Sequence, residues 1–252
     1  MRRALVALAL AAASVPAAAG WSVSADFEHF RWTEDTSPKV SETGPRLGIG
    51  VNWTQEKPAG WRFAYHGRLY FGSLNYDGSA LFSGEPVTGT TDYSGVTHEG
   101  RALYRIPGSA TGAEFVAGLG LDYWTRQLSS IQSEDYRVLY LRLGANFDRR
   151  GPSGWYGGAG VKYPLSVDED AHFPELGFQP NPHLEPKGAL SAYAEIGYRF
   201  NDRWSLSGYY DSYRFGESAA VEVTQAGTGT PFTFVQPKSS VDSLGLRLRR
   251  GY

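Results

Sequence analysis

Residues 61–74 read WRFAYHGRLYFGSL, and their side chains alternate between two kinds. Large apolar residues fall on odd positions, which are Trp61, Phe63, Tyr65, Leu69 and Phe71. Basic residues fall on even positions, which are Arg62, His66 and Arg68. Successive side chains of a β-strand point to opposite faces. The stretch therefore predicts a strand with one apolar face and one charged face.

The same alternation recurs along the chain and predicts about ten strands. Their expected ranges are 21–33, 45–55, 60–74, 92–106, 112–126, 135–148, 154–165, 188–200, 203–214 and 240–252. Of the 14 prolines, only Pro45 and Pro164 fall within a predicted strand, which agrees with the exclusion of proline from strand interiors. No linker interrupts the pattern, so we expect residues 20–252 to form one domain.

The connections between the predicted strands alternate strictly in length. The short ones are 56–59, 107–111, 149–153 and 201–202, and the long ones are 34–44, 75–91, 127–134, 166–187 and 215–239. Outer-membrane β-barrels have this arrangement, with short turns at one end, long mobile loops at the other and both termini at the short-turn end. The pattern predicts an up-and-down barrel.

The N-terminal residues predict export. Arg2 and Arg3 precede an apolar run, 4–15, and the small residues 17–19 then suit a cleavage site, so residues 1–19 are expected to be a signal peptide. Later apolar runs are too short for a spanning helix.

The chain has no cysteine, which excludes disulfides, thiolate metal sites and a lipidated cysteine. Without Arg2 and Arg3 the net charge of −2 becomes −4, which does not indicate a nucleic-acid binder.

The final residues carry a further signal, because Leu244, Leu246, Leu248 and Tyr252 share one parity and end on an aromatic side chain. With the alternating loops, the chain resembles the small Gram-negative outer-membrane barrels of eight to ten strands, such as the OmpA transmembrane domain and the omptins. The resemblance implies an all-β, antiparallel, up-and-down transmembrane β-barrel of about ten strands in the outer membrane. Its partners would be outer-membrane lipid and, during insertion, the barrel-assembly machinery.

A soluble periplasmic β-sandwich or lipocalin-like barrel is the alternative fold, because it also alternates along its strands. Its apolar face would point inward. The strongly charged second face and the regular alternation of loop lengths favour the membrane barrel.

The densest group of potentially catalytic residues lies in the fourth long connection and consists of Asp168, Glu169, Asp170 and His172. Asp170-Ala171-His172 is similar to the Asp-x-His pair at the rim of omptin proteases. Omptins also need a second acidic pair, and the connection 75–91 offers only Asp77 and Glu85. The same oxygens could hold Ca²⁺ or Mg²⁺ if they converged. We expect no catalytic site, no metal and no cofactor, with Asp170 and His172 as the alternative protease pair.

Parity also predicts which charged side chains point into the barrel. The bases are Arg46, Arg62, Arg68, Arg101, Arg105, Arg126, Arg142, Lys162, Arg199, Arg247 and Arg249, and the acids are Asp26, Glu28, Glu99, Glu114, Asp122, Glu195 and Asp211. The 11 bases exceed the 7 acids by 4. The sequence therefore predicts a structural barrel or a narrow porin-like channel that favours small anions. A surface adhesin that binds ligands through its long loops is the alternative.

Overall fold

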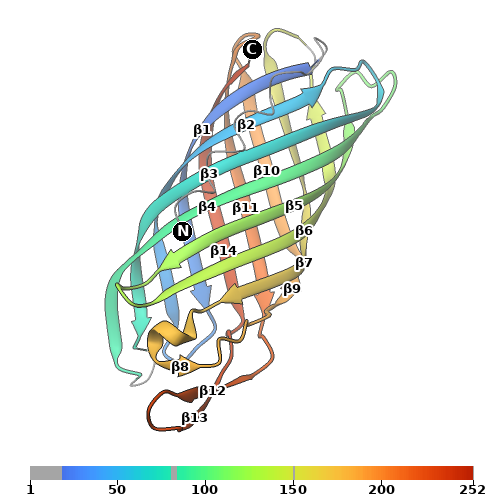
Figure 1. Ribbon diagram of the computed structural model, residues 1–252. Coiled ribbons are helices and arrows are strands. Elements are labelled where there is room, and N and C mark those ends of the chain that lie inside the picture. The colour runs from blue at the N-terminus through green and yellow to red at the C-terminus, as the bar shows by residue number, and fades with distance from the viewer. Residues whose placement is uncertain (1–18, 81–83, 150, 252) are drawn as a thin grey trace.

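The computed structural model describes residues 19–80, 84–149 and 151–251, and these form a closed, tilted β-barrel (Figure 1). The barrel strands are β1 (Ala19–Glu34), β2 (Val40–Gln55), β3 (Gly60–Ser79), β4 (Pro86–Arg105), β5 (Glu114–Gln127), β6 (Ser133–Asp148), β7 (Gly154–Asp170), β10 (Ser191–Arg199), β11 (Trp204–Gly216) and β14 (Ser239–Gly251). Each pairs antiparallel with its neighbour in sequence, and β14 returns to β1 to close the barrel. Short β9 (Lys187–Ala189) precedes β10 and also pairs with β11.

The predicted ten-stranded, up-and-down antiparallel barrel is thus confirmed, and its short turns and long loops lie at opposite ends (Figure 1). The predicted signal peptide lies outside the described residues except for Ala19, which begins β1. Tyr252 also lies outside them. Within the described ranges, no helix is long and apolar enough to cross a membrane.

Several strands are longer than predicted, mostly at the long-loop end. β4 begins at Pro86 rather than near residue 92, and β7 runs to Asp170 rather than to residue 165. The backbone ladder continues there, for example between Asp77 and Thr88. Outward side chains in these extensions are polar, so the alternation of apolar and polar residues stops before the strand does.

The outer surface consequently has two zones. One is an apolar belt whose outward side chains include Phe27, Ile49, Leu69, Leu119, Leu143, Ile196 and Leu246, all exposed, with Ile49 at 63%. The other, nearer the long loops, is a polar collar that includes Arg31, Asn75, Asp92, Arg137 and Asp168. A continuous apolar band around the outside is the surface of a lipid-facing barrel. The alternative of a soluble barrel with its apolar face inward is therefore wrong.

Aromatic rings mark the short-turn edge of the belt. Trp61 packs against Tyr104 with ring centroids 5.2 Å apart, and Trp155 packs against Tyr198 at 5.3 Å. Amphipathic rings of this kind are enriched where a barrel surface leaves the hydrocarbon.

Where the apolar belt meets the polar collar, a layer of buried side chains fills the interior of the barrel. We call this layer the aromatic plug. It consists of Phe30, Trp32, Tyr70, Leu74, Tyr93, Trp124, Tyr136, Val138, Tyr140, Val167, Tyr213, Phe215 and Val241. Trp124 stacks on Tyr136 with centroids 5.0 Å apart, and Trp32 lies 5.3 Å from the same ring. Rings from opposite walls of the barrel therefore meet.

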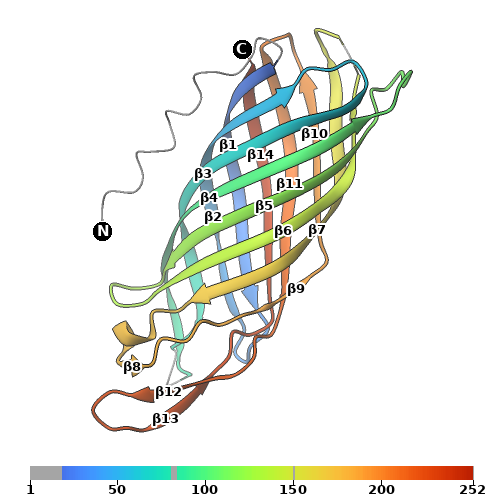
Figure 2. The same ribbon diagram turned by 45° about the vertical axis from the view of Figure 1, so that its right-hand side comes forward.

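Two of the predicted mobile loops instead fold together as a cap at the long-loop end (Figure 2). β8 (Phe178–Gln179), β12 (Val221–Gln225) and β13 (Pro231–Phe234) form a small sheet beside a 3₁₀ turn, η1 (Phe173–Leu176). Its apolar centre consists of Ala171, Phe173, Phe178, Leu184 and Val223, with Leu176, Val221, Phe232 and Phe234 packed around them. The cap is held by its own small core.

Candidate functional site: the charged interior

The charged side chains predicted to point inward lie inside the barrel and contact one another. Arg46 binds Glu28 at 2.6 Å. Arg68 lies 2.7 Å from Asp26 and 3.1 Å from Glu28. The Arg46 pair joins the neighbouring strands β2 and β1, and the Arg68 pairs reach from β3 past β2 to β1, so charge holds the wall together as well as backbone bonds do.

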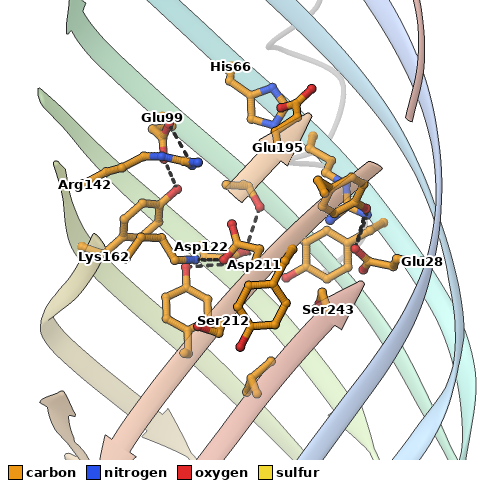
Figure 3. Close-up of a pocket in the computed structure, with 18 of the residues that line it drawn as sticks. Glu28, His66, Glu99, Asp122, Arg142, Lys162, Glu195, Asp211, Ser212 and Ser243 are labelled. Carbon is orange, nitrogen blue, oxygen red and sulfur yellow. Dashed lines mark hydrogen bonds and ion pairs between the residues drawn. The ribbon is translucent and has the colours of Figure 1, made fainter. Parts of the chain in front are cut away.

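The centre of the barrel contains a second group of inward charges (Figure 3). Asp122 accepts hydrogen bonds from Tyr70 at 2.8 Å and Thr97 at 3.0 Å. Lys162 forms an ion pair with Asp211, and its ammonium lies 3.6 Å from the ring of Tyr213. These groups border a central cavity of about 90 Å³. That space is large enough for several water molecules and small for most metabolites.

Nearer the short-turn end, arginines outnumber carboxylates, because three glutamates are each shared by two arginines. These are Glu99 between Arg101 and Arg142, Glu114 between Arg62 and Arg105, and Glu195 between Arg249 and Arg247. Arg247 also binds Asp26 at 2.8 Å. Arginine stays ionised in proteins, so the arrangements around Glu99 and Glu114 leave positive charge beside the interior space.

Beyond the plug, in the collar, the ratio reverses. Arg126 is 2% exposed and binds Glu42 at 2.7 Å, Glu134 at 2.7 Å and Glu34 at 3.1 Å. The phenol of Tyr93 also donates to Glu42. One guanidinium thus faces three carboxylates. The interior is therefore polarised, with surplus positive charge on the short-turn side of the plug and surplus negative charge on the long-loop side.

Two further cavities lie at the ends of the barrel. The vestibule, about 280 Å³, opens at the short-turn end and shares Arg101, Arg142 and Glu195 with the central cavity. The mouth pocket, about 500 Å³, lies at the long-loop end and reaches Arg126 and Glu134. The aromatic plug separates the mouth pocket from the vestibule.

Glu169 joins the collar to the cap. Its side chain is buried on β7, and its backbone exchanges hydrogen bonds of 2.9 Å with Leu184. With its amide nitrogen turned inward, Gln236 donates to the Glu169 carboxyl group at 3.2 Å, and Gln236 is itself bonded to Ser218. Burial raises the pKa of Glu169 well above its ordinary value, and the nearby Glu134 carboxylate raises it further.

We therefore expect the cap to open more readily as the pH rises. A carboxyl group whose pKa is raised by folding stabilises the folded state fully below its unfolded value, about 4.5, and this contribution is lost as the pH rises through the raised pKa. Amide exchange of β12 and β13, corrected for intrinsic rates, should show protection falling from pH 5 to pH 8. The isosteric Glu169→Gln variant should keep its protection across that range.

Glu222→Gln provides the control, because Glu222 is exposed on β12. This variant should retain the pH dependence of the unmodified protein. If Glu169→Gln retains it as well, Glu169 is not the titrating group that opens the cap.

Asp168, Glu169 and Asp170 lie on β7 rather than in a loop, which corrects the sequence prediction. Burial alone would raise the pKa of Asp170, but hydrogen bonds at 3.0 Å from Asn181 and from the His172 backbone lower it overall. The imidazole of His172 contacts Asp135 at 3.2 Å instead of Asp170. Asp170 therefore holds the following segment in place.

The rest of the omptin-like arrangement is also not assembled around these residues. Asp77, the first acid available for a second pair, lies on β3 with its side chain exposed. Across residues 19–80, 84–149 and 151–251, no three His, Asp or Glu side chains converge to hold a metal ion.

Sequence reasoning missed the collar carboxylates. Glu34, Glu42 and Glu134 have the inward parity of their strands, but the predicted strands ended before them. Glu169 has the opposite parity to inward Lys162, because a register irregularity lies between Leu139 and Tyr140 in the pairing of β6 with β7. Extending the parity past the end of the apolar alternation would have found the first three and not Glu169.

No protein-family model and no curated protein sequence matches the chain. Among solved structures it is similar to the outer membrane protease OmpT from Escherichia coli, with a TM-score of 0.50 and 10% identity over 94% of this chain and 96% of that one. The transport unit of the Escherichia coli autotransporter AIDA-I gives 0.46 and 10% over 91% and 90%. An outer membrane channel from Pseudomonas putida F1 gives 0.46 and 12% over 95% and 97%. The likeness to OmpT concerns the fold alone and confirms the closed antiparallel β-barrel.

Proposed function

We propose that the protein is a non-conducting barrel of the bacterial outer membrane that binds ligands at its long-loop end. The apolar belt would contact lipid, the short turns would face the periplasm, and the collar and cap would stand outside the cell. The aromatic plug is the observation that carries the proposal. No catalysis is assigned to the chain.

The plug supports closure for a packing reason. Trp32 and Tyr136 are fully buried, and Trp124 is 4% exposed. Trp32 contacts Tyr136 across the barrel, and Trp124 stacks on Tyr136 from the adjacent strand. Interiors packed in this way leave few voids larger than a water molecule. Passage of a solute would require several rings to move together. Among the hypotheses drawn from the sequence, a structural or binding barrel fits this interior better than a porin-like channel does.

The charge distribution supports the same conclusion. An anion that crossed the barrel would leave the arginine-rich side and then meet Glu34, Glu42 and Glu134, which share the single guanidinium of Arg126. A path built for anions would not place its surplus carboxylates at one end.

Binding at the long-loop end is supported by the mouth pocket. Its volume of about 500 Å³ lies in the range of small-molecule sites, roughly 300–1,000 Å³. It combines apolar residues such as Val40 and Leu128 with Tyr76 and the Glu34–Arg126 pair. Ligand sites typically combine an apolar lining with a few placed polar groups.

The decisive measurement for closure is conductance in planar bilayers. We expect no channel steps from the unmodified protein, whereas Trp124→Ala combined with Tyr136→Ala should produce them, because the pair removes two stacked rings from the plug. A heat-dependent shift in gel migration verifies that each protein has folded.

Replacing residues 221–234 by a short Gly-Ser linker is the matched control. It removes the cap strands but leaves the plug, so this protein should show no channel conductance. Steady conductance from the unmodified protein would show that the barrel is open and would favour the channel hypothesis. Binding is tested separately with Tyr76→Ala, which changes the lining of the mouth pocket and should weaken retention of any ligand that the intact barrel binds on a ligand array.

A further inference from the structure

We propose that the mouth pocket binds an organic ammonium ion between the carboxylate groups of Glu34, from β1, and Glu134, from β6. The ligand is a small molecule that carries a protonated amino group on an apolar body. This inference rests on the proposed function and deepens it, because it names the chemical class of ligand that the long-loop end takes.

Each of these two glutamates has one oxygen bound within the protein and one oxygen free. Oε1 of Glu34 accepts hydrogen bonds from the Trp32 indole at 2.9 Å and from Arg126 at 3.1 Å. Oε2 of Glu134 accepts them from Arg126 at 2.7 Å and from the Tyr136 phenol at 3.3 Å. Within the described part of the chain, no donor reaches Oε2 of Glu34 or Oε1 of Glu134.

The free oxygens are accessible from the pocket. Glu34 and Glu134 both line it, and each side chain is 11% exposed. Neither free oxygen belongs to the fully buried side-chain atoms that lack a hydrogen-bond partner among the described residues, so both keep surface that a ligand can contact. The side chain of Arg126 is only 2% exposed. A ligand in the pocket therefore meets carboxylate oxygens and not the guanidinium group.

The charges around these oxygens favour a cation. Glu34, Glu42 and Glu134 surround the single positive charge of Arg126, a difference of 1 − 3 = −2 when all are ionised. Burial raises the pKa of Glu134, and the nearby carboxylates of Glu34 and Glu42 raise it further, although Arg126 opposes them. Buried charges in proteins are normally paired. A second cation beside Glu34 and Glu134 would supply the missing positive charge.

The arrangement suits an ammonium group better than a metal ion. Glu34 and Glu134 bind the same nitrogen of Arg126, Nη1, so their carboxylate groups lie close together. A protonated amino group has several donors on one atom and can reach both free oxygens. Calcium takes about six to eight oxygen ligands, whereas across the described residues no three acidic or histidine side chains converge to hold a metal ion.

The rest of the pocket suits the apolar body of such a ligand. Its volume of about 500 Å³ is far larger than an amino group needs. Val40, Leu128 and Tyr76 border the same space as the two glutamates. Aromatic rings pack against apolar groups and also attract cations.

The test is titration calorimetry on the full chain in non-ionic detergent near neutral pH, with tyramine as the probe. Tyrosol is its neutral counterpart, because it carries a hydroxyl group where tyramine carries the protonated amino group. We expect one saturable tyramine site, with tyrosol bound about tenfold more weakly or less.

Two variants of the pocket separate the loss of charge from a loss of folding. Glu34→Gln and Glu134→Gln should each weaken tyramine binding about tenfold and leave tyrosol binding nearly unchanged, because each removes a charge and keeps the volume. Arg126 keeps two hydrogen bonds to Glu42 in both variants. Heat-modifiable migration verifies that each variant has folded.

Asp77→Asn is the matched control. Asp77 follows Tyr76 directly on β3, but its side chain is exposed and does not line the pocket. This variant should bind tyramine as the unmodified protein does. The proposal is overturned if tyramine does not bind, if tyrosol binds as tightly, or if Asp77→Asn weakens tyramine binding as much as the pocket variants do.

A failure of the proposed function would give a different result. The ligand array with Tyr76→Ala reports binding at the mouth pocket for ligands of any charge. Array ligands that Tyr76→Ala loses and Glu34→Gln retains would support the pocket as a binding site and reject the ammonium class. Array ligands that Tyr76→Ala retains in full would count against the mouth pocket itself.

Discussion

Replacing Arg126 with methionine should destabilise the long-loop half of the barrel by about 3–5 kcal/mol, the typical effect of removing one partner from a buried ion pair. Arg126 is the cation that binds Glu34, Glu42 and Glu134 inside the collar. Methionine fills similar volume, so the loss would come from charge and not from a cavity. Urea unfolding from lipid vesicles, followed by tryptophan fluorescence, measures it.

The pH dependence provides an internal check on this result. Burial raises the pKa of Glu134, so its carboxyl group takes up a proton more readily in the folded protein than in the unfolded chain. Acidification should therefore restore part of the stability of Arg126→Met, because protonated carboxyl groups no longer repel one another. A second substitution, Glu42→Gln, should restore part of it at neutral pH.

Arg137→Met is the matched control. Arg137 lies on β6 in the same half of the barrel, but its side chain is 57% exposed and its nearest carboxylate, on Asp168, is 3.7 Å away. Exposed pairs of this kind contribute little, roughly 0–1 kcal/mol. Equal losses from Arg126→Met and Arg137→Met would mean that the collar glutamates do not depend on Arg126.

The sequence predicted the barrel because alternation and loop length are local signals. Leu141 and Arg142 illustrate this: adjacent residues face opposite sides of β6, as the period of two requires. The antiparallel order followed from the short turns between neighbouring strands. Neither inference needed information on distant contacts.

The plug and the cap could not be predicted in this way, because both depend on distant parts of the chain. Parity places Trp32 and Phe215 on inward faces, but their ring centroids lie 6.2 Å apart across 183 residues of sequence, which depends on the tilt and register of the closed barrel. The cap likewise joins Phe178 to Phe232 from two separate loops. The sequence predicted a net positive charge inside the barrel. It could not predict that the aromatic plug separates an arginine-rich side from a carboxylate-rich side, because that depends on the three-dimensional arrangement.

The second large effect tests the lipid-facing surface. Leu141→Arg should reduce the free energy of unfolding in bilayers by about 2–4 kcal/mol, the cost of an arginine near the membrane midplane on the lipid face of a barrel. Leu141 lies in register with Leu119 and Tyr163, which are 54% and 46% exposed within the apolar belt. Asn75→Arg introduces the same side chain at an exposed position of the collar and should have little effect.

Arg142→Leu separates this effect from damage to the interior. Arg142 is one of the bases predicted to point inward, and in the structure it binds Glu99 at 3.2 Å and packs on Tyr193. We therefore expect a loss of stability that is nearly the same in detergent and in bilayers, since Glu99 keeps its contacts with Arg101 and Tyr140 in both. The loss from Leu141→Arg should instead grow with the hydrocarbon thickness of the lipid, because only that substitution places a charge against the acyl chains. If thickness changes neither variant, or if Asn75→Arg is as damaging as Leu141→Arg, the apolar belt is not the surface that meets the membrane.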